Sequence, residues 1–223
     1  MTLMSPPAAI APVSDPDQVV VITGVDAAGY ERYLAARGER SRPKMIYLDG
    51  DLILVSPGRP RERMNLRLGT FLYEVIANLR LQVLRLGQMT WRHGDGPGVE
   101  GDQTYYLANE PLVRDKEIDL EVDPPPDLAI EVVHTHKADH ALEVHARLGV
   151  PEVWVCDAKR VAIMIRQVDG TYRESERSLA LPFLSAAEIY AQIQQPAGMA
   201  ELDWLEGVRR WVREVLVPRV HPE

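Results

Sequence analysis

The sequence has little cysteine, no long apolar segment and no excess of positive charge. Its single cysteine, Cys156, cannot form an internal disulfide, which fits a reducing compartment and leads us to expect a cytoplasmic protein. No uninterrupted apolar run approaches the ~18 residues that a membrane-spanning helix needs, which excludes an integral membrane protein. The first 18 residues contain neither lysine nor arginine and so lack the charged start of a secretory signal.

The net charge of −8 argues against a protein that binds nucleic acid through its overall electrostatic field. Any contact with nucleic acid therefore has to be local. One candidate surface is a group of arginines, and a solvated helix face is the alternative interpretation of the same residues. The group consists of Arg59, Arg61, Arg63, Arg67, Arg80, Arg85 and Arg92.

The 223 residues are enough for one sizeable core with appendages. Residues 1–18 are rich in proline, alanine and serine and are expected to form a flexible tail. A single domain is expected over residues 19–195. A stripe of apolar residues at helical spacing then predicts a C-terminal helical extension over residues 196–223, packed on the domain.

Hydrophobic periodicity predicts an α/β domain, a mixed sheet flanked by helices. Strands are expected at 19–23, 45–48, 52–55, 81–92, 103–107, 128–133, 153–155, 161–166 and 172–176, and helices at 27–36, 62–78, 138–148, 185–195 and 201–215. Asp49-Gly50 is the strongest hairpin signal. The order strand, helix, strand across residues 128–155 predicts a parallel pair joined by a crossover.

Two carboxylates occupy positions that suit chemistry. Glu131 lies in the apolar run 128–133, where a buried carboxylate is costly unless it binds a metal or another cation. Asp127 shares its strand face but is expected to cap the entry of the strand. Asp102 follows a glycine-rich loop at the head of the strand over 103–107. Asp102 and Glu131 together with waters and phosphate oxygens would suit Mg²⁺, and ordinary surface acids are the alternative.

Four segments carry a family resemblance in one continuous order. They are Ile46–Leu52, Ser56-Pro57, Pro125–Val133 and Leu148–Trp154. They resemble the Uma-type restriction endonuclease family of the PD-(D/E)XK nuclease superfamily. The similarity covers residues 19–193 and is densest over 102–183. It implies a restriction-endonuclease-like core that hydrolyses DNA.

By this resemblance, Asp102 and Glu131 hold Mg²⁺ or Mn²⁺, and Glu74 is a possible additional acid. The lysine of the superfamily is missing, because its two expected positions carry Val133 and Ala141. Neither residue can steady a transition state or orient an attacking water. Lys137, four residues before Ala141, is the substitute candidate if the helix starts early enough to include it, and a nearby histidine is the alternative.

Other departures affect the same region. Gly101 replaces the proline before Asp102, His145 replaces a tyrosine, and the usual acid on the helix falls at His140 unless a one-residue shift restores Asp139. The alternative function is accordingly a catalytically inactive module that binds nucleic acid or protein. A homodimer is also expected, since dimers are common among nucleases that cut both strands.

Four histidines invite a separate interpretation as a zinc site. They are His134, His136, His140 and His145. Their spacing matches no standard zinc motif, so solvated or hydrogen-bonded histidines are the simpler expectation. A zinc-dependent hydrolase stays open as a third function.

Overall fold

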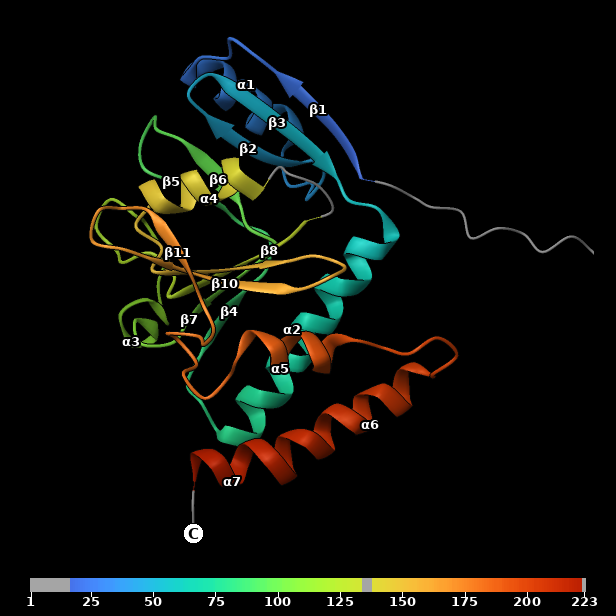
Figure 1. Cartoon of the computed structure of the whole chain (residues 1–223). Coiled ribbons are helices and arrows are strands. Elements are labelled where there is room, and N and C mark those ends of the chain that lie inside the picture. Colours follow the sequence, from blue (N-terminus) through green and yellow to red (C-terminus); the bar gives the residue numbers. More distant parts are fainter. Residues whose placement is uncertain (1–16, 134–137, 222–223) are drawn as a thin grey trace, which may run out of the picture.

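Two β-sheets form the framework of the protein. The computed structural model describes residues 17–133 and 138–221, and Figure 1 shows the smaller sheet above the larger one. The smaller sheet is antiparallel throughout and has the strand order β1-β3-β2-β6-β5. Its strands are β1 (Gln18–Ile22), β2 (Lys44–Leu48), β3 (Asp51–Ser56), β5 (Thr90–Arg92) and β6 (Gly98–Glu100).

The larger sheet is mixed and has the order β11-β10-β9-β8-β7-β4. Its strands are β4 (Leu84–Leu86), β7 (Gln103–Tyr106), β8 (Leu128–Val132), β9 (Glu152–Cys156), β10 (Val161–Arg166) and β11 (Tyr172–Ser175). β8 and β9 are parallel, which confirms the parallel pair predicted from the sequence. Every residue of β8 is buried, so the carboxylate of Glu131 lies in the interior.

Helices cover the sheets and fill the space between them. They are α1 (Ala27–Arg37), α2 (Arg59–Leu79), α3 (Glu110–Val113), α4 (Ala138–Arg147), α5 (Ala186–Ile193), α6 (Glu201–Trp211), the π-helix η1 (Val212–Leu216) and α7 (Val217–Val220). α2, α5 and α6 gather on one side of the larger sheet (Figure 1). The fold class, an α/β fold with helices around a mixed sheet, is thereby confirmed.

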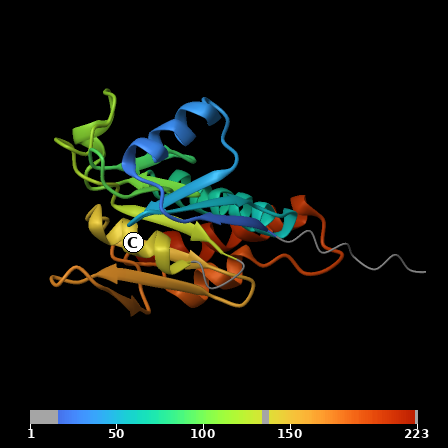
Figure 2. The same cartoon turned by 90° about the horizontal axis from the view of Figure 1, so that it is seen from above.

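Strand β2 carries apolar side chains on both of its faces. Met45 and Tyr47 pack with Tyr30 of α1, whereas Ile46 packs with Val144 of α4. This alternation follows from the two-residue period of a strand. The view from above in Figure 2 shows α1 and α4 on opposite sides of the smaller sheet. Helix α4 therefore lies between the two sheets and can reach groups on either.

The predicted hairpin and the long helix form as expected. Asp49 and Gly50 connect β2 to β3 with φ angles of 49° and 93°. Two successive positive φ angles are typical of the tight turns that suit twisted strands. Helix α2 buries the stripe that includes Leu68, Phe71 and Val75 and ends where Arg80 takes a left-handed conformation. These elements are fixed by local sequence.

The prediction of one strand over residues 81–92 is wrong, because the chain changes sheets within that segment. β4 belongs to the larger sheet and β5 to the smaller one, and the chain returns between β6 and β7. The single central sheet expected from the sequence is consequently two sheets. Strand β6 and the short helix α3 were not predicted. Strand pairing depends on residues that are far apart in the chain, so a local apolar pattern does not predict it.

The C-terminal helices share the core of the larger sheet. Trp204 and Val208 of α6 and Val212 and Leu216 of η1 are buried in the same cluster as Phe71 of α2. The boundary at residue 196 stays a prediction, as does the tail over residues 1–18, of which the structure describes only the last two.

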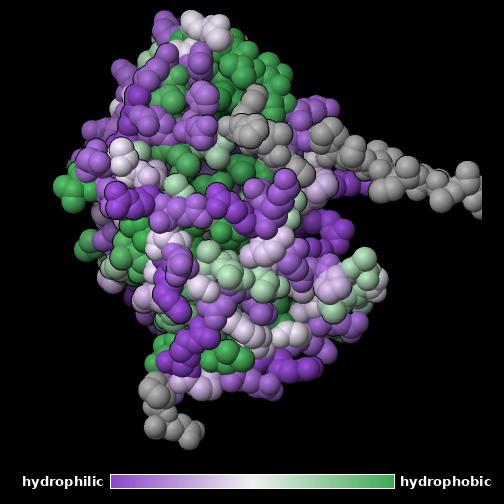
Figure 3. All heavy atoms as spheres, in the orientation of Figure 1, coloured by the Kyte–Doolittle hydropathy of each residue, from purple (hydrophilic) through white to green (hydrophobic). Residues whose placement is uncertain are grey.

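The single thiol is buried, and one face of the molecule is mostly polar (Figure 3). Cys156 is fully buried at the end of β9, and burial raises the pKa of its thiol, so it stays protonated at neutral pH. Within the described ranges, no helix is long and apolar enough to cross a membrane. Figure 3 shows a largely hydrophilic face with hydrophobic side chains over the smaller sheet. Among the large hydrophobic side chains, Val20 and Val21 of β1 are exposed.

Candidate active site

The two predicted acids meet where the chain passes from one sheet to the other. Asp102 lies between β6 of the smaller sheet and β7 of the larger one, and Glu131 lies on β8, the neighbour of β7. The backbone N–H of Asp102 donates to the carbonyl of Ile130 at 3.1 Å. Its Oδ2 accepts from the backbone N–H of Val132 at 2.7 Å. Asp102 is therefore held against β8 on both sides of Glu131.

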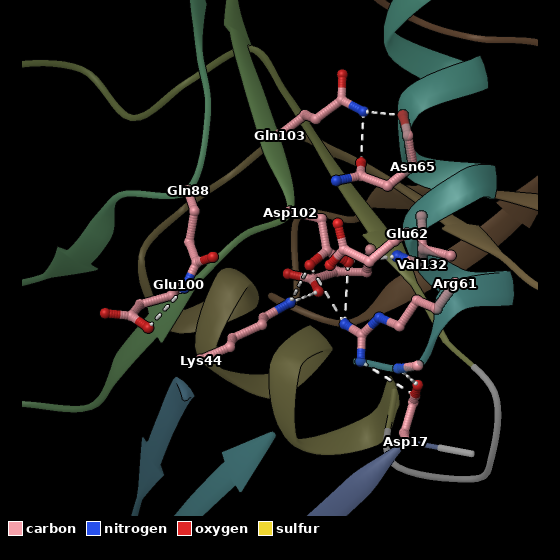
Figure 4. A network of polar contacts seen from close by, with 12 residues as sticks. Asp17, Lys44, Arg61, Glu62, Asn65, Gln88, Glu100, Asp102, Gln103 and Val132 are labelled. Atoms are coloured by element: carbon pink, nitrogen blue, oxygen red, sulfur yellow. Dashed lines mark hydrogen bonds and ion pairs between the residues drawn. The ribbon is translucent and has the colours of Figure 1, made fainter. Parts of the chain in front are cut away.

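A lysine from the smaller sheet bridges the two acids. Lys44 is the first residue of β2, and its side chain is buried. Its Nζ lies 2.5 Å from Oε2 of Glu131 and 3.1 Å from Oδ1 of Asp102. Figure 4 shows this side chain pointing at Asp102. An ammonium group thus joins the two sheets at the predicted carboxylate pair.

An arginine from α2 approaches Asp102 from the other side. Arg61, in the first turn of α2, donates from Nη2 to Oδ2 of Asp102 at 3.0 Å and from Nη1 to Asp17 at 3.3 Å (Figure 4). Burial alone would lower the pKa of Arg61, but the carboxylates of Asp102, Glu131 and Asp17 outweigh it and raise that pKa. Arg61 is therefore charged at every relevant pH.

A histidine from α4 completes the surroundings of Glu131. The ring Nε2 of His145 lies 2.8 Å from Oε1 of Glu131, and both side chains are buried. Among the described residues, Nδ1 of His145 has no hydrogen-bond partner. Burial by itself would raise the pKa of Glu131, but the Lys44 ammonium and the His145 hydrogen bond lower it below its usual range. Glu131 is therefore ionised although it is buried.

Within residues 17–133 and 138–221, the charges of the site do not cancel. Two cations, Lys44 and Arg61, face three carboxylates, those of Asp17, Asp102 and Glu131. Among these described residues one negative charge is left over if His145 is neutral. A site with surplus negative charge is suited to a cation, provided that the cation can reach the oxygens.

Part of this network is open to solvent through a cleft of about 760 Å³ between α2 and strands β4 and β7. Asp102 and Lys44 line it, whereas Glu131 and His145 do not. Its other walls include Arg42, Tyr73, Arg85 and Gln103. Asp102 and Lys44 are thus the members of this network that line the cleft, and the Lys44 ammonium links them to the buried carboxylate of Glu131.

The donor set fits a hard divalent cation. The Lys44 ammonium contacts both acids, so both carboxylates can share one positive centre. Mg²⁺ is commonly held by one or two carboxylates plus waters and substrate phosphates, at about 2.0–2.1 Å. A metal held by both carboxylates would bind oxygens that Lys44 now contacts, so the metal and the ammonium would compete for them. Residues 17–133 and 138–221 contain no group of three or more His, Cys, Asp and Glu side chains able to hold a metal.

Other predicted site residues lie elsewhere. Glu74 lies 13 residues after Arg61 on α2, about 20 Å along the helix axis, where it accepts from Nε of Arg209 at 2.9 Å. The structure therefore does not bring Glu74 to the acids. Lys137 lies outside the described residues, as do His134 and His136 of the possible zinc site.

The remaining sequence candidates have structural roles. Asp127 accepts from the backbone N–H groups of Leu107 and Asn109 at 2.6 and 3.0 Å, which caps the entry of β8 as expected. Ala141 is buried against the hydrophobic cluster between the sheets. It lies one helical turn before His145 and is too short to reach the acids.

Sequence reasoning missed Lys44 and did not distinguish Arg61 from the neighbouring arginines. Lys44 begins a strand of otherwise apolar residues, and a charged residue at that position was the one available signal. Its partners lie 58 and 87 residues away, so spacing could not reveal them. His145 was noted as a departure from the family pattern and as a member of the possible zinc site, but not as a partner of Glu131.

The ionised state of Glu131 predicts how stability depends on pH. Its pKa is lower in the folded chain than the ~4.3 of an unfolded chain, so the unfolded state binds more protons as the pH falls below about 5. The stabilisation is complete above that pH and is lost as the pH falls toward the folded pKa. Urea unfolding in EDTA between pH 5 and pH 3 should therefore show a steeper loss for the wild type than for Glu131→Gln. Parallel losses would contradict the lowered pKa.

Comparisons with known proteins show the family and the fold. The family model Uma2, described as "Putative restriction endonuclease", matches residues 29–198. The chain is also similar to a solved structure described as a putative nuclease belonging to DUF820 from Anabaena variabilis. That similarity has a TM-score of 0.52 and 14% identity, covers 76% of this chain and 99% of the other, and shows the fold. No curated protein matches the chain.

Proposed function

The chain belongs to the Uma2 family, and from that premise we propose that it is a metal-dependent endonuclease that hydrolyses phosphodiester bonds of DNA. The proposal rests on one observation above all. The Lys44 ammonium lies within 3.1 Å of both predicted acids, at the wall of an open cleft. Two carboxylates and one lysine are the side-chain types that the superfamily is expected to use, and they converge here from β2, the β6–β7 connection and β8.

Lys44 is proposed to take the part of the lysine that is absent at Val133 and Ala141. An ammonium beside the reacting phosphate stabilises negative charge in the transition state and can orient the attacking water. Because Lys44 comes from β2, the smaller sheet supplies what the strand of Glu131 and the helix after it lack. Lys137 stays a second candidate for this role.

Asp102 and Glu131 would hold Mg²⁺ or Mn²⁺, which when bound lowers the pKa of a coordinated water and stabilises charge on the phosphate. The other side chains keep these acids in place. Arg61 and the backbone N–H of Val132 fix the carboxylate of Asp102, and His145 fixes that of Glu131. Such partners orient ligands and typically affect metal affinity or activity by 10–100-fold.

Cleavage of supercoiled plasmid and of single-stranded DNA with Mg²⁺ or Mn²⁺ tests the proposal. We expect Asp102→Asn and Glu131→Gln to abolish cleavage, because both remove an ionised oxygen ligand. Lys44→Met should lower the rate about 10²–10³-fold, the usual cost of one charge-stabilising donor. Lys137→Ala tests the second candidate. The control is Glu143→Gln, an exposed acid on α4 that pairs with Arg147, and this variant should cleave like the wild type.

Metal binding provides a readout that does not depend on turnover. Mn²⁺ should raise the Tm of the wild type and of Glu143→Gln but not of Glu131→Gln. The increase should be larger for Lys44→Met, because the ammonium no longer competes for the carboxylate oxygens. Equal shifts for the wild type and Glu131→Gln, or cleavage that survives Glu131→Gln, would contradict the proposal.

One observation favours the alternative, a catalytically inactive nuclease fold that binds nucleic acid. All four oxygens of Asp102 and Glu131 already have nitrogen partners in the protein. Neutralisation of both acids by the protein's own nitrogen groups is expected in a module that no longer binds a metal. Binding of DNA without cleavage or metal-induced stabilisation would support it. The homodimer and the cytoplasmic location stay predictions, and sedimentation equilibrium would test the first.

A further inference from the structure

The cleft beside the acids continues along one face of α2 well beyond them. Asn65, Leu66, Gly69, Thr70 and Tyr73 all line it. Their spacing of one, three and four residues puts them along the same side of the helix. Tyr73 lies 11 residues after Glu62, the first residue of α2 that lines the cleft, which is about 17 Å along the helix axis. The cleft is thus long enough to hold several units of a linear polymer that passes Asp102.

Its far end carries an aromatic ring and a cation that are stacked on each other. The guanidinium carbon of Arg85, on β4, lies 5.2 Å from the centroid of the Tyr73 ring. Nη2 of Arg85 also donates to the carbonyl of Gly69 at 3.4 Å, which ties β4 to the helix. Tyr73 is nevertheless 53% exposed. The pair is therefore held in position while much of the ring faces solvent.

A single exposed tyrosine is ordinary at a protein surface. Here three further features coincide within one cleft. Leu66 is 67% exposed and adds a second apolar side chain to the same wall. Arg85 is exposed, so its charge is available to a ligand. Asp102 and Lys44 of the candidate active site line the other end of the same cleft.

Exposed cations in the cleft can contact a polyanion despite the acidic net charge of the chain. Its lining includes the cations Arg42, Lys44 and Arg85 and the acids Glu62 and Asp102. Arg42 pairs with Glu62 at 2.8 Å but is about half exposed, so it can also contact a phosphate. Phosphate contacts of this kind hold a nucleic acid chain without reading its sequence.

The shape of the cleft favours an unpaired strand. A volume of about 760 Å³ is within the usual ~300–1,000 Å³ of small-ligand pockets and cannot enclose a duplex. The bases of a duplex are also stacked on one another, so Tyr73 could not stack on them. Proteins that bind single strands combine such an aromatic platform with a cationic groove, and each stacked base contributes about 1–3 kcal/mol.

We propose that this cleft binds an unpaired strand of DNA, with one base stacked on the Tyr73–Arg85 pair and the backbone directed toward Asp102 and Lys44. The inference rests on the proposed function, since it takes the reacting polymer to be DNA. The preferred substrate is then single-stranded or locally unpaired DNA. Tyr73 is the residue that selects the unpaired strand.

Fluorescence anisotropy of the full chain in EDTA tests this without cleavage. The probes are a labelled single-stranded DNA oligonucleotide of mixed sequence and the same strand annealed to its complement. The wild type should bind the single strand more tightly than the duplex. Tyr73→Ala should weaken single-strand binding about 5–150-fold, the equivalent of one stacked base. Tyr73→Phe keeps the ring and should bind within about 2-fold of the wild type.

Matched controls separate stacking from a general loss of aromatic or basic residues. Tyr33 is exposed on α1, outside the cleft, and Tyr33→Ala should bind like the wild type. Arg85→Gln should weaken binding, whereas Arg173→Gln, an exposed position on β11, should not. Because Tyr73 and Arg85 are exposed, all variants are expected to keep the Tm of the wild type within a few degrees.

The outcomes distinguish this inference from the proposed nuclease activity. Equal binding by the wild type and Tyr73→Ala, tighter binding of the duplex, or no binding at all would overturn the inference, and plasmid cleavage could still establish the nuclease. Weakened binding by Tyr73→Ala in a chain that cleaves nothing would support the inference and overturn the proposed hydrolysis.

Discussion

Replacing Glu131 with leucine is expected to lower the free energy of unfolding by about 3–5 kcal/mol. The change removes the partner of two buried groups at once, the ammonium of Lys44 at 2.5 Å and the ring of His145 at 2.8 Å. Among the residues that the structure describes, Lys44 keeps its 3.1 Å contact with Asp102 alone, and Asp102 also accepts from Arg61. A buried cation with one shared counterion is poorly compensated, so the folded state loses more than the contact itself. Urea unfolding at neutral pH in EDTA measures the loss.

The matched comparison is the double variant Lys44→Met/Glu131→Leu. Removing both members of a buried ion pair and filling the space with apolar side chains is often neutral or stabilising. The double variant should therefore be more stable than Glu131→Leu alone, and the two single losses should not add. Additive losses would mean that Lys44 and Glu131 do not interact, which would also remove the main support for a shared role in catalysis.

Replacing Trp204 with alanine is expected to cost about 3–5 kcal/mol, the usual range for removing a buried tryptophan. Its side chain is 4% exposed and packs in the core cluster that α2 and β8 share, and its Nε1 donates to the carbonyl of Gln192 at 2.8 Å. A loss of this size would show that the helices after residue 196 stabilise the whole domain. Thermal or urea unfolding followed by circular dichroism measures it.

Leu202 provides the control on the same helix. It lies two residues before Trp204 and is 61% exposed, so Leu202→Ala should change the free energy of unfolding by no more than about 0.5 kcal/mol. Similar losses for the two variants would mean that the burial of Trp204 does not determine what it contributes to stability. A small loss for Trp204→Ala would mean that the extension folds separately from the domain.

The buried position of the two acids explains why cations of the protein itself contact them. Asp102 lies where the chain changes sheets, and Glu131 lies on the most buried strand of the larger sheet. A carboxylate in that place needs a cation nearby, because burial disfavours its charge. Lys44 and Arg61 provide it in this structure, and the proposed metal would share or take that role.

The sequence by itself determined most of the helices and strands and the two acids. The Asp49-Gly50 turn, the stripe on α2 and the apolar run of β8 are local patterns, and each is set by a few neighbouring residues. A carboxylate within such an apolar run is costly to bury, so the position of Glu131 along the chain already predicted a cation partner. The family resemblance added the expected roles of Asp102 and Glu131 as metal ligands and the restriction-endonuclease-like type of fold.

Only the tertiary structure decided which cation serves the acids and where a substrate can lie. Lys44 is 58 residues from Asp102 and 87 from Glu131. They meet because the chain crosses between two sheets, a pairing that no local pattern encodes. Tyr73 and Arg85 likewise meet across α2 and β4. Short-range periodicity fixes each helix and strand, whereas the packing of strands and helices far apart in the chain fixes the site.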